Sequence, residues 1–140
     1  MIVNRTEFIK FWEKALEFPH ATFCNEYYYL MSLDELYNKY IPNYDKFIKT
    51  NNLASSINWD CSKFALAFKM SCDMIYNNKN VDSHIAVGSA HLDLKDKEFD
   101  HAINFIIYQR DKKPDYISFD CFNKVELGKD NFKNLSLLYF

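Results

Sequence analysis

The segment DCSKFALAFKMSCDMIY, residues 60–76, limits the fold of this chain more than any other part of its 140 residues. Its apolar side chains recur at helical spacing and form one broad face, which leaves only Lys63, Lys69 and Asp73 to look outward. A helix with so little polar surface is expected to be buried, so other elements must cover it. The sequence therefore predicts a globular domain packed around a central helix.

Two capping-box pairs predict helices ahead of this segment. In each of the pairs Asn4/Glu7 and Ser32/Glu35, a polar residue that can cap a helix precedes a glutamate by three positions. Apolar residues follow the first pair at helical spacing, which predicts a helix over about residues 5–17. The front part of the chain is therefore expected to be helical.

The pattern changes to that of β-strands after the central helix. The stretches HIAVGSAHLDL and YISFDCF alternate apolar and polar residues, and HAINFIIYQ between them is rich in β-branched and aromatic residues. The polar stretch RDKKPD separates the last two stretches and predicts an antiparallel hairpin. The C-terminal SLLYF fits a final strand or a packed tail.

These elements predict an α+β fold in a single domain over residues 1–140. The helical part is expected over about residues 1–77 and the sheet part over about residues 83–140, because no linker or repeat divides the chain. The expected architecture is a set of N-terminal helices, a buried central helix and a C-terminal antiparallel β-sheet.

Composition and spacing exclude several kinds of ligand. The two glycines, Gly88 and Gly128, lie too far apart to build a glycine-rich phosphate loop. The 17 basic and 19 acidic residues give a net charge of −2, without the basic surface that nucleic-acid binding needs. No apolar run reaches the ~18 residues that span a bilayer. His84 and His91 fall on opposite faces of a strand, so we expect no metal site from them. With the observations above, the sequence also leads us to expect no cofactor, no nucleic acid and no membrane.

The N-terminal stretch MIVNRTEF lacks the apolar core of a signal peptide, so a cytoplasmic location is expected. In that compartment the four cysteines, Cys24, Cys61, Cys72 and Cys121, are expected to be thiols. The excess of lysine over arginine suggests an AT-rich coding sequence, as in a low-GC bacterium or its phage. For a phage protein the expected location is the host cytoplasm.

Cys61 has the chemically most distinctive position of the four cysteines. It follows the candidate N-cap Asp60, so unpaired amides and the positive end of the helix dipole favour its thiolate. The Asp60 carboxylate opposes the thiolate unless its side chain turns away to cap the helix. Cys24 and Cys72 fit small core residues instead.

His101 and Asp120 are the candidate partners of this thiol. His101 begins the apolar strand HAINFII, where packing would fix its ring, and Asp120 ends the next strand. In a tight hairpin the residues around His101 face residues 119–123, so a hydrogen bond from His101 to Asp120 is expected. Asp115 is a rival partner, although it lies in the expected turn.

The stretches DCSKFALAFKMSCDMIY, AVGSA, HAINFII and ISFDCF resemble the catalytic core of transglutaminase-like proteins in the papain-like superfamily. The resemblance covers about residues 58–122. It implies that Cys61 is the nucleophile, His101 the general base and Asp120 the acid that orients the imidazole. The candidate oxyanion donors are the backbone amide of Cys61 and the residues Asn58, Trp59, Asn52 and Tyr28.

Two functions are expected from this resemblance. The main expectation is a cysteine-dependent hydrolase or acyltransferase, such as a thiol protease, acting on an amide or related acyl bond through Cys61, His101 and Asp120. Its substrate would be a peptide, a protein or a small-molecule amide. The alternative is a non-catalytic papain-like binding module, such as a small phage or bacterial effector, that sequesters a ligand or binds a protein partner. The oligomeric state is left open.

Overall fold

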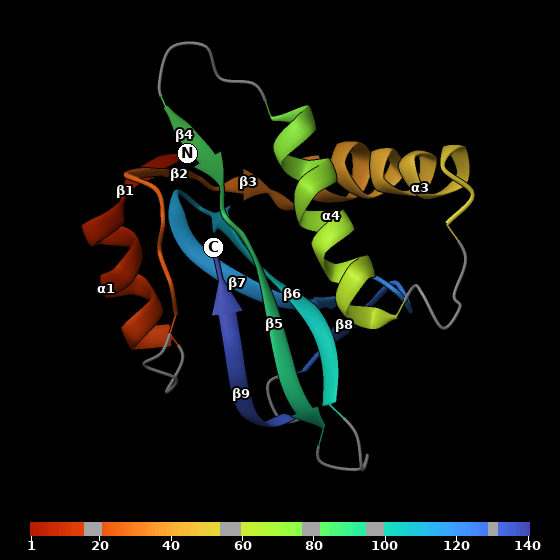
Figure 1. Ribbon diagram of the computed structural model, residues 1–140. Coiled ribbons are helices and arrows are strands. Elements are labelled where there is room, and N and C mark those ends of the chain that lie inside the picture. The colour runs from red at the N-terminus through yellow and green to blue at the C-terminus, as the bar shows by residue number, and fades with distance from the viewer. Residues whose placement is uncertain (16–20, 54–59, 77–81, 95–99, 129–131) are drawn as a thin grey trace.

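The computed structural model describes residues 1–15, 21–53, 60–76, 82–94, 100–128 and 132–140. In this part of the chain the strands form two sheets, and the three longest helices pack around them (Figure 1). These helices are α1 (Arg5–Ala15), α3 (Ile41–Thr50) and α4 (Cys61–Ile75). A short helix, α2 (Leu33–Glu35), continues through the π-helical turn η1 (Leu36–Tyr40) into α3.

Both sheets mix parallel and antiparallel pairs. The smaller sheet has the order β1-β2-β4, and the larger has the order β8-β7-β6-β5-β9 with β3 paired to β6. The β2–β4 and β3–β6 pairs are parallel and the other pairs are antiparallel. The strands are β1 (Ile2–Asn4), β2 (Tyr27–Tyr29), β3 (Met31–Ser32), β4 (Ser83–Ile85), β5 (Val87–Leu94), β6 (Asp100–Arg110), β7 (Lys113–Asp120), β8 (Val125–Leu127) and β9 (Phe132–Tyr139).

The expected order, N-terminal helices followed by an antiparallel sheet, is wrong. Three strands, β1 to β3, lie in the front part of the chain and join both sheets. Strand β2 falls within residues 20–31, a stretch whose sequence pattern fits either an extended segment or a helix start. In β2 the side chains alternate in burial, with Tyr28 buried between the exposed Tyr27 and the half-buried Tyr29. Strands this short carry too few residues for a two-residue period to be visible in the sequence.

The two capping boxes are confirmed. The Glu7 amide donates to Asn4 Oδ1 over 2.9 Å, and the Asn4 amide donates back to Glu7 Oε2 over 3.2 Å. Ser32 and Glu35 make the same reciprocal pair at the start of α2. Each pair provides acceptors for amides that have no partner within the helix, which is why the helices begin where the sequence predicts.

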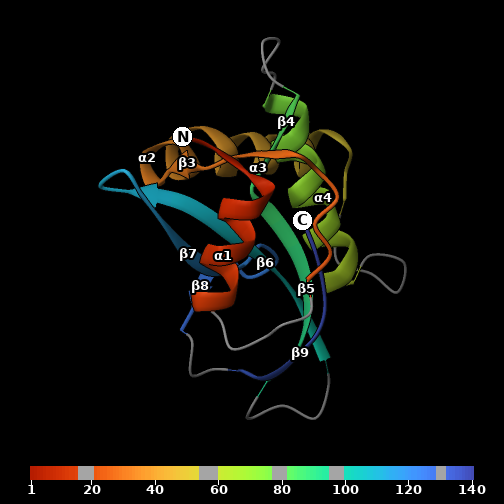
Figure 2. The same ribbon diagram turned by 90° about the vertical axis from the view of Figure 1, so that its left-hand side faces the viewer.

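Strand β6 separates two hydrophobic clusters. Its odd-numbered residues Ile103, Phe105 and Ile107 belong to the cluster with α1, where the rings of Trp12 and Phe105 lie edge to face at 5.6 Å. Its even-numbered residues Ala102, Ile106 and Tyr108 belong to the cluster with α3 and α4. Because side chains alternate along a strand, α1 and α4 cover opposite faces of the larger sheet (Figures 1 and 2).

Helix α4 is less buried than its apolar pattern predicts. Phe64, Phe68 and Cys72 face the sheet and are buried, as expected. Leu66, Met70 and Met74, however, are all more than half exposed. These three residues are spaced four apart and so share one exposed side of the helix, where Leu66 and Met70 line a pocket together with Phe47 of α3. The prediction of a helix covered on nearly all sides is therefore corrected.

Asn104 connects α4 to the sheet at the centre of the molecule. Its fully buried side-chain amide donates to the carbonyl oxygens of Ala65 on α4, at 2.9 Å, and Gly88 on β5, at 3.1 Å. We expect Asn104→Ala to lower the free energy of unfolding by about 2–3 kcal/mol, because it removes two buried hydrogen bonds and leaves a void. Urea unfolding measures this. Asn38→Ala, at an exposed site, is the control, and an equal effect of both variants would contradict the role of Asn104.

Candidate functional site

Cys61 lies at the first turn of α4, as the sequence predicts. The preceding Asp60 is the N-cap of the helix, and its Oδ1 accepts a hydrogen bond from the Lys63 amide over 3.2 Å. Asp60 therefore uses its side chain to cap the helix. Cys61 itself is half-buried, so its sulfur sits at a helix N-terminus with part of the residue accessible.

A backbone amide of β6 holds the sulfur of Cys61. The Ala102 N–H donates to Cys61 Sγ over 3.4 Å. This amide is not used by β7, because the pairing of β6 with β7 ends at Asn104 and Phe119. The beginning of β6 thus has an open edge, and the first turn of α4 packs against it.

His101 and Asp120 form a buried pair next to Ala102, whose amide contacts this thiol. His101 Nε2 lies 2.7 Å from Asp120 Oδ2, and the two residues are 7% and 3% exposed. The hairpin that brings them together closes at Asp111 and Lys112, which both have positive φ, as a tight two-residue turn requires. The expected hairpin and the expected His101–Asp120 hydrogen bond are both confirmed.

Asp120 also holds the turn that follows β7. Its Oδ1 accepts hydrogen bonds from the amides of Phe122, at 3.0 Å, and Asn123, at 2.9 Å, while the Asn123 side chain donates to Oδ2 at 2.7 Å. Burial alone would raise the pKa of Asp120, but the hydrogen bonds, that of His101 first among them, lower it to about 2. Asp120 is therefore a carboxylate at neutral pH.

The charge of Asp120 fixes the tautomer of His101. A carboxylate only accepts hydrogen bonds, so the Nε2 atom of His101 must carry a proton and donate it. In the neutral imidazole the other nitrogen, Nδ1, then has a free lone pair. The cluster of Cys61, His101 and Asp120, here called the thiol cluster, thus combines a partly accessible sulfur with an oriented imidazole.

The other candidate residues have different surroundings. Asp115 lies in β7, where it accepts a hydrogen bond from the Tyr108 hydroxyl over 2.9 Å and pairs with Arg110, so it is not the partner of His101. Tyr28 packs in the cluster with α1 and not in the cluster that Cys61 contacts. Asn58 and Trp59 lie outside the described residues. Sequence reasoning missed the Ala102 amide, because a backbone donor has no signature in the sequence.

The remaining cysteines only partly follow expectation. Cys72 and Cys121 are buried thiols, whereas Cys24, which was expected in the core, is exposed. Burial raises the pKa of the Cys121 thiol to about 12, and the neighbouring Asp120 carboxylate acts in the same direction. Cys61 is therefore the half-buried thiol with a structured set of polar neighbours. Whether Cys61, His101 and Asp120 are catalytic stays a prediction.

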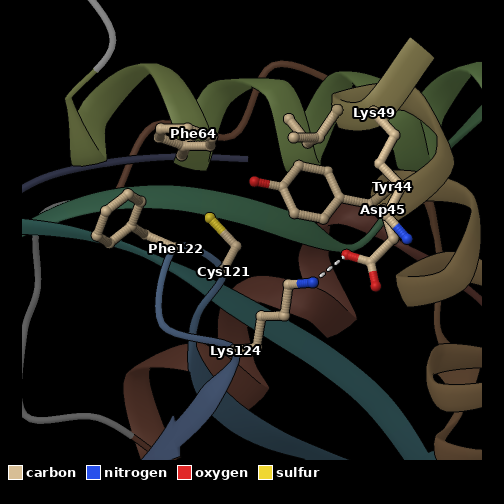
Figure 3. Close-up of a pocket in the computed structure, with 8 residues that line it drawn as sticks. Tyr44, Asp45, Lys49, Phe64, Cys121, Phe122 and Lys124 are labelled. Carbon is tan, nitrogen blue, oxygen red and sulfur yellow. Dashed lines mark ion pairs between the residues drawn. The ribbon is translucent and has the colours of Figure 1, made fainter. Parts of the chain in front are cut away.

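A pocket opens next to the thiol cluster, between α3, α4 and the turn after Asp120 (Figure 3). Its volume is about 140 Å³. Phe64 lies one helical turn after Cys61 on α4, and Cys121 directly follows Asp120, so two lining residues adjoin the cluster in sequence and structure. The lining residues are Tyr44, Asp45, Ile48, Lys49, Phe64, Cys121, Phe122 and Lys124.

The described residues contain neither a metal-binding cluster nor a membrane-spanning helix. Among the described residues, no group of three or more histidine, cysteine, aspartate or glutamate side chains could hold a metal ion. No helix in the same part of the chain has the length and hydropathy needed to cross a membrane.

Comparison with known proteins identifies a shared fold. No family model and no curated protein matches the chain. A solved structure described as "PSL1a-E64 complex" matches with a TM-score of 0.74 and 16% identity over 99% of this chain and 51% of its own. Polyporus squamosus lectin, bound to the human-type influenza-binding epitope Neu5Aca2-6Galb1-4GlcNAc, matches with a TM-score of 0.70 and 15% identity over 99% of this chain and 49% of its own. The chain thus spans about half of each structure, and identity this low supports the fold alone.

These findings contradict the resemblance to transglutaminase-like proteins. One of the two solved structures with this fold is described as a lectin, and neither a family model nor a curated protein supports a cysteine protease. The papain-like α+β fold class is therefore corrected to the mixed-sheet fold of these structures. The resemblance was based on one helix start and one hairpin, and such a local pattern does not define the rest of a fold.

The predicted function is corrected on the same ground. The lectin likeness conflicts with a cysteine-dependent hydrolase or acyltransferase, and with protease or acyltransferase chemistry on an amide bond. It agrees better with the alternative expectation, a binding module without catalysis.

Proposed function

We propose that this chain is a binding module for a small molecule, and that the thiol cluster of Cys61, His101 and Asp120 is the centre of its binding site. One observation carries the proposal. The Cys61 sulfur at the start of α4 accepts a hydrogen bond from the Ala102 N–H over 3.4 Å, and the residue before Ala102, His101, is paired with Asp120 at 2.7 Å.

Burial divides the cluster into a contact group and a support. Cys61 is half-buried, while His101 and Asp120 are almost fully buried. A ligand would therefore meet the sulfur first. The support is rigid, because Asp120 accepts hydrogen bonds from the imidazole and from the turn at residues 122–123. A preorganised site of this kind loses little entropy when a ligand binds.

The similar structures provide two probes. One of them is a complex with E64, and the other contains the trisaccharide Neu5Aca2-6Galb1-4GlcNAc. Each ligand belongs to a protein about twice as long as the matched region, so either could bind outside the part that this chain resembles. Only a ligand whose binding depends on Cys61 fits the proposal.

We expect E64 to bind the wild-type protein and to lose its binding in Cys61→Ser. Intact-mass spectrometry and titration calorimetry measure this. Cys24→Ser changes another accessible thiol and is the matched control, which should bind as the wild type does. The proposal is wrong if E64 does not bind, or if it binds Cys61→Ser as tightly as wild type. Binding of the trisaccharide with equal affinity in both proteins, without any binding of E64, would also contradict it.

A further inference from the structure

We infer that the pocket beside the thiol cluster holds a benzene-sized apolar group of the ligand, together with an oxygen atom that accepts a hydrogen bond from Tyr44. The inference rests on the proposed function, because it assigns one end of the same ligand to this pocket. It is carried by the lining of the pocket, by the state of the Tyr44 hydroxyl and by the connection of the pocket to Asp120.

The walls of the pocket suit an aromatic or branched apolar group. The rings of Phe64 and Phe122 lie 5.1 Å apart with tilted planes, and Ile48 and Cys121 add further apolar surface. A volume of about 140 Å³ is close to that of engineered cavities that bind benzene. The pocket is therefore large enough for one ring and too small for a sugar chain.

Tyr44 places a single unsatisfied donor in this apolar setting. The residue is 2% exposed, and its hydroxyl has no hydrogen-bond partner in the described part of the chain. Figure 3 shows the hydroxyl pointing into the pocket between Phe64 and Cys121. The Cys121 thiol beside it is only a weak partner. A buried hydroxyl without a partner is costly, and a ligand oxygen would remove that cost.

The Tyr44 hydroxyl is protonated at neutral pH, as a phenol ordinarily is, and burial raises its pKa further, with the nearby Cys121 thiol acting in the same direction. The hydroxyl can therefore donate a hydrogen bond to an acceptor such as a carbonyl oxygen. The charged residues at the rim are partly neutralised, because Lys124 pairs with Asp45 at 2.7 Å.

The pocket and the thiol cluster share a wall. Phe122 lines the pocket, and its amide donates to the Asp120 carboxylate that also holds His101. Phe64 follows Cys61 by three residues on α4, so both lie on the same side of the helix. A ligand that contacts the sulfur can thus extend into the pocket along this side of α4.

Acetophenone and ethylbenzene test the inference, because they have similar sizes and only the first has a carbonyl oxygen. We expect the wild type to bind acetophenone about fivefold more tightly than ethylbenzene, in line with one neutral hydrogen bond. Tyr44→Phe should lose this preference and still bind ethylbenzene. Chemical-shift titration measures both affinities. Tyr27→Phe, which removes an exposed hydroxyl elsewhere, is the control and should keep the preference.

Further variants separate this inference from the proposed function. Phe122→Ala opens a wall of the pocket at a partly exposed turn and should weaken the binding of both probes. Cys61→Ser should bind acetophenone as wild type does, and acetophenone at saturation should slow the binding of E64 to the wild type. The pocket inference is wrong if Tyr44→Phe still prefers acetophenone to ethylbenzene, or if acetophenone does not compete with E64. Either result would count against the pocket even if E64 binding depends on Cys61. Acetophenone binding without any binding of E64 would instead overturn the proposed function.

Discussion

Replacing Asp120 with alanine is expected to lower the free energy of unfolding by about 3 kcal/mol at neutral pH. The carboxylate accepts hydrogen bonds from His101, the amides of Phe122 and Asn123, and the Asn123 side chain. Alanine leaves these buried or partly buried donors without an acceptor, and each orphaned group costs about 1 kcal/mol or more. Urea unfolding measures the change. Asp82→Asn, at a fully exposed carboxylate, is the control and should change stability by less than about 0.5 kcal/mol.

The effect of Asp120 should depend on pH in a definite direction. The pKa of Asp120 falls from its ordinary value of 3.8 to about 2 on folding, so the folded protein holds the charged form more strongly than the unfolded chain does. The resulting stabilisation is complete above about pH 4 and is lost as the pH falls through about 2. The stability of wild type should therefore approach that of Asp120→Ala between pH 4 and pH 2. A constant difference over this range would show that Asp120 acts only by packing.

Asp120→Asn separates two tasks of the carboxylate. The amide oxygen can still accept from the turn amides of Phe122 and Asn123, so the turn should survive. The side chain no longer carries a charge, and its NH₂ group can donate to His101 Nε2. That donation would move the imidazole proton to Nδ1, the opposite tautomer. We expect this variant to be more stable than Asp120→Ala and to show the reversed tautomer by ¹⁵N NMR of the histidine ring.

The sequence was sufficient to predict the local geometry of the thiol cluster. A helix start is encoded within four residues, so the caps at Asn4 and Asp60 were visible directly. The hairpin between β6 and β7 is also local, and its two-residue turn fixes the register. Once the register is set, Asp120 must lie near the beginning of β6. Short-range rules therefore account for the His101–Asp120 pair.

The parts that could not be predicted depend on contacts between distant segments. Strand β2 pairs in parallel with β4, which lies after the central helix. A strand of three residues has too short a sequence pattern to indicate a pairing partner so far along the chain. The exposed side of α4, at Leu66 and Met70, likewise depends on which elements happen to cover the helix. In the sequence Tyr44 has the spacing of an ordinary buried helix residue. That spacing gives no sign that its hydroxyl lacks a hydrogen-bond partner among the described residues. The pocket is thus a product of packing.

The fold and the site also carry different kinds of information about function. The comparison with the two solved structures covers 99% of the chain at 15–16% identity and supports the fold class. It does not determine the chemistry of Cys61, because ligand-contacting residues can change while a fold persists. The role of the thiol cluster must therefore be tested by measurements on Cys61, His101 and Asp120 themselves.

Replacing His101 with alanine is expected to slow the reaction of Cys61 with iodoacetamide at pH 6 by at least about tenfold. The sulfur lies at the N-terminus of α4 and accepts from the Ala102 N–H over 3.4 Å, and His101 directly precedes Ala102, so its imidazole is the candidate base for the thiol proton. In wild type we expect Cys61 to react faster than Cys24, which is more exposed but lacks these partners. Peptide mass spectrometry over time gives the rate for each cysteine.

The matched control is His84→Ala, which removes an exposed histidine whose Nε2 lies 3.9 Å from Asp82 Oδ1. It should leave the rate at Cys61 unchanged. Equal rates for Cys61 and Cys24 in wild type would show that the thiol cluster does not activate its sulfur. A fast reaction that persists in His101→Ala would assign the activation to the helix terminus and the Ala102 amide, and would make His101 a structural partner of Asp120. The imidazole acts through its orientation by Asp120, so Cys61 should also react slowly with iodoacetamide in Asp120→Asn. If His101→Ala slowed the reaction only by disturbing the packing, Cys61 in Asp120→Asn would still react as fast as in wild type.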